Sequence, residues 1–327
     1  MKKFKVVITD YEYDTLEPER KVLEQLDVEI ITVQCKTEED LINIAKDADG
    51  IIHQYASFTK NVINRLEKCK VIARYGIGFD TVDIDAATEK GIYVANVTDY
   101  CLDEVADHTV AMLLTLARKI VTLNNSVKSG EWDYKVSKPI CRLKNRVLGL
   151  VGFGNIPRNV APKAQAFGLK IIVYDPIVPT DIAEDMGVDL VELSELCKQS
   201  DFISIHTPLN KHTKGMFSFE EFNLMKKDAC IINTARGPII DEKALIEALE
   251  QKKIAAAALD VLEKEPINRD HPLIKMDNVL LTPHTAFYSE ESERDLKQKT
   301  AQNVVDVLQG HLPKYLVNPN VQQRISL

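Results

Sequence analysis

Short apolar runs alternate with amphipathic stretches along the first hundred residues. Runs of branched residues with the length of buried strands lie at 6–8, 28–33, 50–53, 70–73 and 92–94. Stretches with helical spacing lie between them, at 18–26, after a capping box of Thr37 and Asp40, at 62–66, and at 83–90 before Gly91. Strands that alternate with helices predict a parallel sheet with right-handed crossovers. We therefore expect a first, smaller α/β domain here.

A second alternating series begins near Arg146. Apolar runs at 147–151, 170–174, 201–205, 230–233, 254–259 and 278–281 predict six strands. Ser218 and Glu221 form another capping box, and Asp241 can cap the helix that follows it. A helical pattern over 292–308 completes the chain. The fold class predicted for this series is again α/β.

The longest helix candidate runs from Asp103 to Lys128. Its apolar residues form a wide stripe at helical spacing: Val105, Ala106, Val110, Leu113, Leu114, Ala117, Ile120 and Val121. A stripe of this width predicts a helix that bridges two domains. It fits burial against a second subunit and burial within one chain equally well.

Composition narrows the class of protein. The net charge of −8 argues against nucleic acid or an anionic membrane as the main partner. The six cysteines are widely spaced, which predicts free thiols in a reducing compartment. The first apolar run is too short for a signal peptide, and no run approaches membrane-spanning length. We expect a cytoplasmic protein with no bound metal, because histidines and cysteines lack metal-ligand spacing.

A glycine turn lies between the strand at 147–151 and a predicted helix that ends near Gly168. Gly152 permits a tight turn, Gly154 permits close approach of a pyrophosphate, and Asn155 and Ile156 open the helix. Asp175 ends the next strand, where a carboxylate can accept both ribose hydroxyls of NAD and repel the 2′-phosphate of NADP. The pattern predicts an NAD site, with an adenosylmethionine site as the rival interpretation.

Two prolines complicate that helix. Pro157 occupies the position of the third glycine of the pattern, and proline is tolerated in a first helical turn. Pro162 falls inside the helix, which it is expected to bend.

Polar residues also follow the later strands, where ligands sit in open α/β sheets. They are Thr207, Thr234, Ala235, Arg236, Asp260 and His284. A redox enzyme acting on a hydroxy acid needs a cation for the substrate carboxylate, an acid/base for the hydroxyl proton, and a carboxylate that orients this base. Arg236, His284 and Glu265 are residues of these types. Spacing alone leaves open a surface arginine, a solvated glutamate and a histidine that caps a carbonyl.

Several ordered motifs resemble the D-isomer-specific 2-hydroxyacid dehydrogenase family over nearly the whole chain. They are Arg74-Tyr75-Gly76-Ile77-Gly78, the glycine turn with Asp175, Thr207-Pro208-Leu209, Asn233-Thr234-Ala235-Arg236-Gly237, Leu259-Asp260-Val261 with Glu265-Pro266, and Pro283-His284-Thr285-Ala286. The closest likeness is to the branch that contains C-terminal-binding-protein-like and phosphoglycerate dehydrogenase-like proteins. Gln54-Tyr55-Ala56, Asp99-Tyr100-Cys101 and Phe287-Tyr288-Ser289 carry it.

The resemblance implies a fold and a domain division. It implies a Rossmann-type NAD-binding domain at 102–290 and a flavodoxin-like substrate-binding domain formed by 1–101 with 291–327, the active cleft lying between them. A homodimer is expected, because the 103–128 stripe is wider than one small domain face requires.

The resemblance also implies residue roles. His284 is similar to the catalytic acid/base, Glu265 to its paired acid and Arg236 to the substrate-binding arginine. Tyr75, Ile77 and Gly78 resemble the substrate loop, with the last two supplying backbone N–H groups. Cofactor-side positions are Gly152, Gly154, Asn155, Ile156, Asp175, Thr207, Thr234, Ala235 and Asp260.

The expected activity is therefore NAD-dependent interconversion of a small 2-oxo acid and a D-2-hydroxy acid. Phosphoglycerate dehydrogenases usually carry an arginine near Gln54, and its absence favours glyoxylate- or hydroxypyruvate-type substrates over 3-phosphoglycerate. The alternative is an NAD(H)-sensing corepressor or scaffold like the C-terminal-binding proteins, which keep the same three catalytic residues.

Overall fold

The chain divides into two compact units. The computed structural model describes residues 3–322. Within them, unit 1 comprises the residues up to Cys101 together with those from Ser289 onward, and unit 2 runs from Leu102 to Tyr288. Each unit contains its own parallel sheet.

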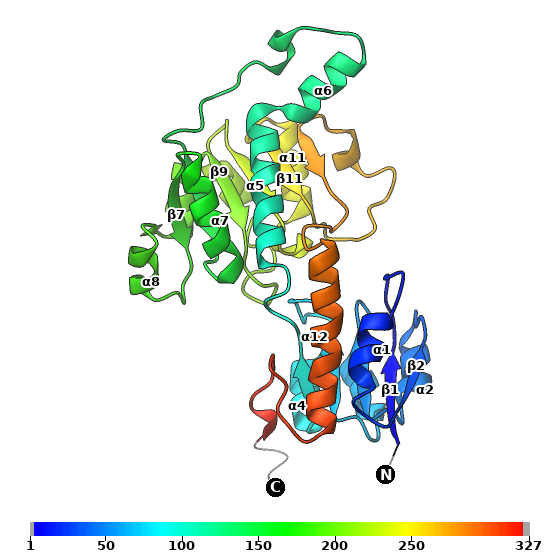
Figure 1. Cartoon of the computed structure of the whole chain (residues 1–327). Helices are drawn as coiled ribbons and strands as arrows, with labels where there is room; N and C mark the ends of the chain where they lie inside the picture. The colour runs from blue at the N-terminus through cyan, green and yellow to red at the C-terminus, as the bar shows by residue number, and fades with distance from the viewer. Residues whose placement is uncertain (1–2, 323–327) are drawn as a thin grey trace. The chain divides into compact units, whose positions relative to one another are not determined.

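Unit 1 is built on a five-stranded sheet with the order β2-β1-β3-β4-β5, in which every pairing is parallel. The strands are β1 (Phe4–Ile8), β2 (Val28–Thr32), β3 (Gly50–His53), β4 (Val71–Arg74) and β5 (Tyr93–Ala95). The helices are α1 (Glu17–Leu23), α2 (Glu38–Ala45), α3 (Lys60–Arg65), α4 (Ile84–Glu89) and α12 (Glu290–Leu308). Helices α1 and α12 pack side by side (Figure 1).

The predicted capping box forms at the start of α2. The Asp40 backbone N–H donates to Thr37 Oγ1 at 3.1 Å, and the Thr37 N–H donates to the Asp40 carboxylate at 3.0 Å. These bonds satisfy two of the N–H groups that a helix start leaves unpaired. The second predicted box, Ser218 with Glu221, is also present. Local sequence signals thus set where these two helices begin.

Unit 2 is built on a seven-stranded parallel sheet with the order β12-β11-β10-β9-β6-β7-β8. The strands are β6 (Val147–Val151), β7 (Lys170–Tyr174), β8 (Asp189–Leu190), β9 (Phe202–Ile205), β10 (Cys230–Asn233), β11 (Ala256–Leu259) and β12 (Val279–Leu281). The helices are α5 (Leu102–Arg118), α6 (Ile120–Lys128), α7 (Asn155–Ala166), α8 (Thr180–Asp185), α9 (Leu193–Gln199), α10 (Phe219–Leu224) and α11 (Glu242–Glu250). Short 3₁₀ turns occupy Tyr134–Ser137, Gly237–Ile239 and Pro272–Lys275.

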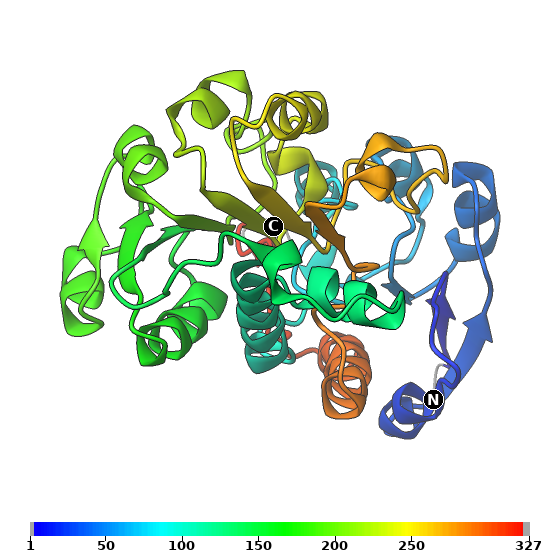
Figure 2. The ribbon, with the colours of Figure 1, turned by 90° about the horizontal axis from the view of Figure 1, so that it is seen from above.

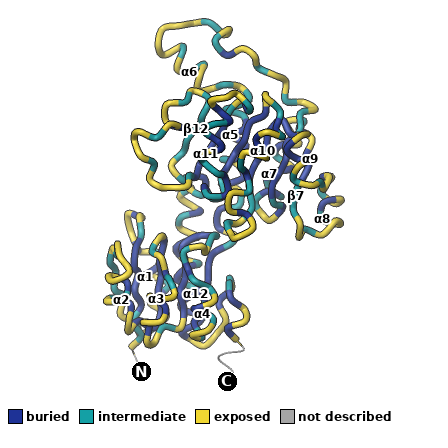
Figure 3. The backbone as a smooth tube through the Cα atoms, turned by 180° about the vertical axis from the view of Figure 1, so that it is seen from behind, coloured by how far each residue is buried: buried dark blue, intermediate teal, exposed yellow. Residues whose placement is uncertain are grey.

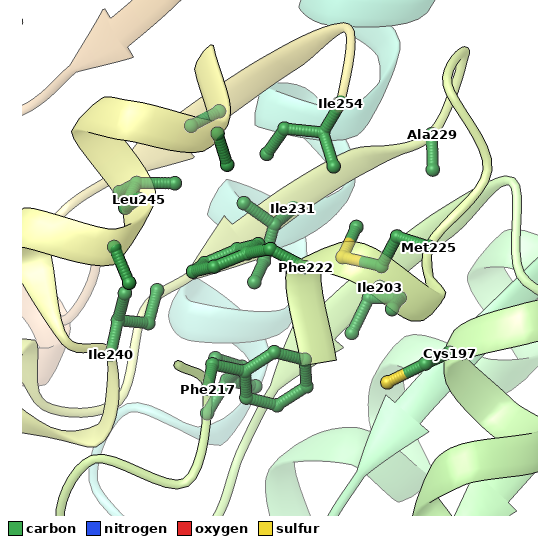
Figure 4. Packing of buried hydrophobic residues seen from close by; sticks show 14 of the residues in the cluster. Cys197, Ile203, Phe217, Phe222, Met225, Ala229, Ile231, Ile240, Leu245 and Ile254 are labelled. Carbon is green, nitrogen blue, oxygen red and sulfur yellow. The ribbon is translucent and has the colours of Figure 1, made fainter. Parts of the chain in front are cut away.

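Helices cover both faces of this sheet, as Figure 2 shows from above. On one face, α5 and α7 place Ala106, Val110, Val160 and Ala161 in a core with strand residues such as Leu150. On the other face, α9, α10 and α11 form a second core, in which Phe222 and Leu245 lie close to Ile231 of β10 (Figure 4). The central strands β6, β9 and β10 are accordingly among the most buried parts of the unit (Figure 3). Three short elements, α8, β8 and α9, were not predicted, and both residues of β8 are exposed.

The single helix predicted from Asp103 to Lys128 is wrong. Lys119 has a left-handed backbone (φ 50°), which a right-handed helix cannot continue through, so α5 ends at Arg118 and α6 begins at Ile120. The first part of the apolar stripe is buried, whereas α6 contains no buried residue. Neither glycine nor proline marks the break, so the sequence contained no signal for it.

Candidate functional site

Five neighbouring strands of unit 2 deliver the predicted residues to one edge of the sheet. Because β12, β11, β10, β9 and β6 are parallel, their carboxyl ends lie at the same edge. Gly152, Thr207, Thr234, Asp260 and His284 each follow one of these strands within three residues. The strand order reverses between β6 and β9, and such a reversal opens a crevice for a ligand. Tertiary structure thus gathers residues that lie far apart in the sequence.

Gly152 lies at this reversal with φ 91°, and its Cβ, if present, would approach the His206 carbonyl oxygen to 2.9 Å. Both constraints exclude a side chain. Gly154 caps α7 without a side-chain bond and has open space around it. The backbone N–H groups of Asn155 and Ile156 donate to no residue within 3–322. The turn therefore presents unpaired donors and a helix dipole, which fit the pyrophosphate of a dinucleotide.

The two prolines do not interrupt the helix. Pro157 is buried in the first turn of α7, and the helix continues through Pro162 to Ala166.

Asp175 holds the glycine turn to the end of β7. Its Oδ2 accepts from the Phe153 N–H at 2.7 Å, and its Oδ1 accepts from the N–H groups of Ile177 and Val178 at 2.8 and 3.0 Å. The carboxylate is half-buried and lies beside the turn. Arg158, which sequence reasoning missed, donates from Nε to the Phe153 carbonyl at 2.8 Å. An acid at this place can accept ribose hydroxyls, as the sequence pattern predicted.

His284 and Glu265 form an ion pair, with His284 Nδ1 2.6 Å from Glu265 Oε2. The second Glu265 oxygen accepts from the Leu262 N–H at 2.9 Å. Burial acts to raise the pKa of Glu265, but the hydrogen bond and charge of His284 together with the Leu262 N–H outweigh it and hold that pKa below its usual value. The carboxylate thus stays ionised and orients the imidazole through its Nδ1.

The backbone of His284 is strained, with φ 53°, a conformation rare for a residue with a side chain. Asp260 holds the segment in place. Its carboxylate accepts from Thr282 Oγ1 at 2.6 Å and from the N–H groups of Thr285 and Ala286 at 2.9 Å each, while its carbonyl accepts the His284 N–H at 2.8 Å. Asp260, predicted on the cofactor side, therefore also fixes the direction of the histidine.

The charge of Arg236 is the last of the influences that hold the pKa of Glu265 below its usual value. Its Nη1 donates to the Ala235 carbonyl at 2.7 Å, and Asn233 braces the turn through the Ala235 N–H and the Arg236 carbonyl. Gly237 makes the approach possible, because a Cβ there would collide with the Leu262 backbone. Arginine, glutamate and histidine are thereby brought together from three strand ends.

Helix α5 contributes two residues that sequence reasoning missed. His108 Nε2 lies 3.1 Å from Thr282 Oγ1, and Thr109 Oγ1 lies 3.0 Å from Thr234 Oγ1. Both anchor strand ends that carry predicted site residues. Their helix showed only an apolar stripe in the sequence, which carried no such signal.

The predicted substrate loop lies in unit 1, after β4. The Gly76 carbonyl accepts from the Val97 N–H at 3.0 Å, and the Ile77 carbonyl accepts from Asn96 Nδ2 at 2.6 Å. In the described part of the chain, the N–H groups of Ile77 and Gly78 donate to no other residue. Two fixed, unpaired donors suit a carboxylate. Tyr75 is only 2% exposed, and its hydroxyl donates to Glu19 at 2.7 Å.

Residues 3–322 contain no helix long and apolar enough to cross a membrane. They also contain no group of three or more acidic, histidine or cysteine residues that could hold a metal ion.

The chain is similar in sequence and in structure to known dehydrogenases and reductases. Residues 110–286 match the model of the "D-isomer specific 2-hydroxyacid dehydrogenase, NAD binding domain". The D-3-phosphoglycerate dehydrogenase of Methanocaldococcus jannaschii is 44% identical over 323 residues, which is 98% of this chain but 60% of that protein. The glyoxylate reductase of Thermococcus litoralis is 40% identical over 80% of this chain and 81% of its own. A crystal structure of D-lactate dehydrogenase from Aquifex aeolicus, complexed with NAD and lactic acid, has a TM-score of 0.87 at 29% identity, covering 95% of this chain and 98% of that one.

Proposed function

The chain belongs to the D-isomer-specific 2-hydroxyacid dehydrogenase family, and on this premise we propose that it reduces a small 2-oxo acid to the D-2-hydroxy acid with NADH. NAD is the cofactor, as the NAD-binding-domain match and the NAD-bound D-lactate dehydrogenase indicate. The observation that carries the proposal is the His284–Glu265 pair, 2.6 Å apart at the carboxyl edge of the sheet, where Arg236 follows the strand β10 that neighbours β11. The relatives compared above are enzymes by name, so the corepressor alternative is not proposed.

His284, Glu265 and Arg236 have different roles in the proposed reduction. Bound NADH supplies the hydride that reduces the substrate carbonyl carbon. His284, protonated, donates a proton from Nε2 to the carbonyl oxygen, and Glu265 stabilises the imidazolium and fixes its orientation. Arg236 holds the substrate carboxylate and polarises the carbonyl by charge-assisted hydrogen bonds. The backbone N–H groups of Ile77 and Gly78 in unit 1 are proposed substrate-binding donors, and Thr207, Thr234 and Ala235 are proposed to line the cofactor.

We favour glyoxylate and hydroxypyruvate as substrates over the phosphorylated acid. Support comes from the glyoxylate reductase match across most of both chains. It also comes from Gln54, whose own side chain is neutral, 4% exposed and accepts from the Glu12 N–H at 2.8 Å, so this residue offers no charge to a phosphate. A panel of 2-oxo acids with NADH, followed by absorbance, tests this. Glyoxylate and hydroxypyruvate should be turned over; a clear preference for phosphohydroxypyruvate would contradict the substrate assignment, and no turnover at all would contradict the activity.

Replacing Glu265 by glutamine should lower the kcat/KM for 2-oxo acid reduction. The amide keeps the shape of the side chain but removes the negative charge, which the hydrogen bond and charge of His284 hold in the ionised form by lowering the pKa of Glu265. The variant therefore loses the charge that stabilises the imidazolium as the proton donor. Steady-state kinetics would measure the loss, and an unchanged kcat/KM would mean that Glu265 does not act on His284.

We further propose a homodimer whose contact includes α6 and the segment after it. Ile120, Val121 and Val127 are 53%, 45% and 47% exposed, and Trp132 and Tyr134 are 88% and 68% exposed. Apolar surface of this kind on one continuous segment is typical of a subunit contact. Analytical ultracentrifugation at micromolar concentration should show a dimer, and Val121→Asp should shift it toward monomer. A monomeric wild-type chain would refute the proposal.

We place the enzyme in the cytoplasm. All six cysteines are free, three of them buried, which suits a reducing compartment. Fractionation of the source cells would test this.

A further inference from the structure

The substrate loop of unit 1 has a buried polar support behind it. Tyr75 begins the loop, and its hydroxyl donates to Glu19 Oε1 on α1 at 2.7 Å. Glu19 is completely buried, and its second oxygen, Oε2, has no hydrogen-bond partner. Tyr75 is thus the side chain that donates a hydrogen bond to this buried carboxylate, on which the charge of Lys297 also acts. Losing the Tyr75 donor would leave the buried Oε1 without this bond, which is costly.

The support extends to α12 through Tyr13 and Lys297. The Tyr13 ring meets the Tyr75 ring edge-on, with centroids 5.2 Å apart and planes at 79°. Lys297 is 1% exposed, and its Nζ lies over the Tyr13 ring, 4.9 Å from the ring centroid. The same Nζ forms an ion pair with Glu293 at 3.2 Å. The Tyr75 side chain therefore contacts Glu19 on α1 and the ring of Tyr13 in the β1–α1 connection, and that ring in turn contacts Lys297 on α12.

Backbone hydrogen bonds also hold the loop around Tyr75. The Tyr75 N–H donates to the His53 carbonyl at 2.8 Å, and the Gly76 and Ile77 carbonyls are held by Val97 and Asn96. These bonds fix the carbonyl side of the loop. The side chain of Tyr75 adds a further attachment, its bond to Glu19 on α1, two residues before the Ile77 N–H group.

We propose that the Tyr75–Glu19 pair is a positioning element that sets the place of the Ile77 and Gly78 N–H groups for the substrate carboxylate. This inference rests on the proposed function. It assigns Tyr75 to support of the loop rather than to contact with substrate, and it adds Glu19 to the machinery. Burial raises the pKa of both side chains, which agrees with a pair that is closed off from water.

The test compares variants that break the pair with one that preserves it. Tyr75→Phe removes the donor and Glu19→Ala removes the acceptor, and each should raise the KM for glyoxylate roughly tenfold, as loss of a hydrogen bond to a charged group does. The Kd for NADH should not change, because the cofactor site lies in unit 2. Glu19→Gln keeps an acceptor oxygen and should restore a KM near that of the wild type. Because both single changes break the same hydrogen bond, the KM of the double variant should be no higher than that of either single variant.

Tyr93→Phe is the matched control. Tyr93 lies on β5 of the same unit, its hydroxyl takes part in no hydrogen bond within the described chain, and the change should leave the KM unaltered. A merely structural role for Tyr75 would instead lower the active fraction and kcat at constant KM. An unchanged KM in folded Tyr75→Phe, or additive effects in the double variant, would overturn the inference.

Hydrogen exchange separates this inference from the proposed function. The segment 74–80 should exchange faster in Tyr75→Phe and Glu19→Ala than in Tyr93→Phe, whether or not any 2-oxo acid is reduced. Lack of turnover by the wild type would refute the proposed function alone, whereas equal exchange rates would refute the positioning role. If Tyr75→Phe fails to fold, the comparison of Glu19→Ala with Glu19→Gln decides the question.

Discussion

His284→Asn is expected to reduce the turnover of 2-oxo acid by roughly two to four orders of magnitude, the usual contribution of general acid–base catalysis. Asparagine cannot donate a proton from the Nε2 position, and Glu265 then loses the partner it meets at 2.6 Å. The Kd for NADH should remain nearly the same, because the glycine turn and Asp175 do not depend on this side chain. Stopped-flow measurement of NADH consumption and fluorescence titration of NADH would separate the two effects.

His212→Asn is a suitable control for that experiment. His212 is exposed on the loop after β9, and within residues 3–322 its backbone N–H, which donates to Asn210 Oδ1 at 2.8 Å, is the one group of this residue in a hydrogen bond. Its replacement should leave turnover unaffected. If His284→Asn kept most of its activity, a different group would have to supply the proton, and the mechanism would be wrong.

The second large effect concerns the choice between NADH and NADPH. The wild-type enzyme should prefer NADH by roughly two to three orders of magnitude in kcat/KM, because the Asp175 carboxylate accepts the ribose hydroxyls and repels a 2′-phosphate. Asp175→Asn keeps an acceptor oxygen for the Phe153 N–H and removes the charge. It should therefore narrow the preference by at least about tenfold, mainly through improved use of NADPH.

Steady-state kinetics with both cofactors would measure this preference. Asp181→Asn provides the control, since Asp181 is an exposed acid in the first turn of the nearby helix α8. Equal efficiency of the wild type with both cofactors would mean that Asp175 only braces the turn and does not face the ribose.

The sequence by itself determined the alternation of strands and helices and most helix starts. The reason is that burial periodicity and capping are local: Thr37 and Asp40 form their box from neighbouring atoms, and so do Ser218 and Glu221. The glycine turn was predictable for the same reason, because a positive φ at Gly152 is a property of one residue and its flanking strands. Family membership also followed from the sequence, because the motifs and their order along the chain are properties of the sequence itself.

Only the tertiary structure decided which distant residues meet and which predicted element breaks. Lys119 turns left-handed without glycine or proline, so no local rule could divide the 103–128 helix into α5 and α6. The 2.6 Å contact of His284 with Glu265, the bracing of the histidine by Asp260 and the bond from Tyr75 to Glu19 each join residues brought together by strand order and helix packing. Sequence spacing contains no information about such distances, because they are set by the sheet and the helices packed on it.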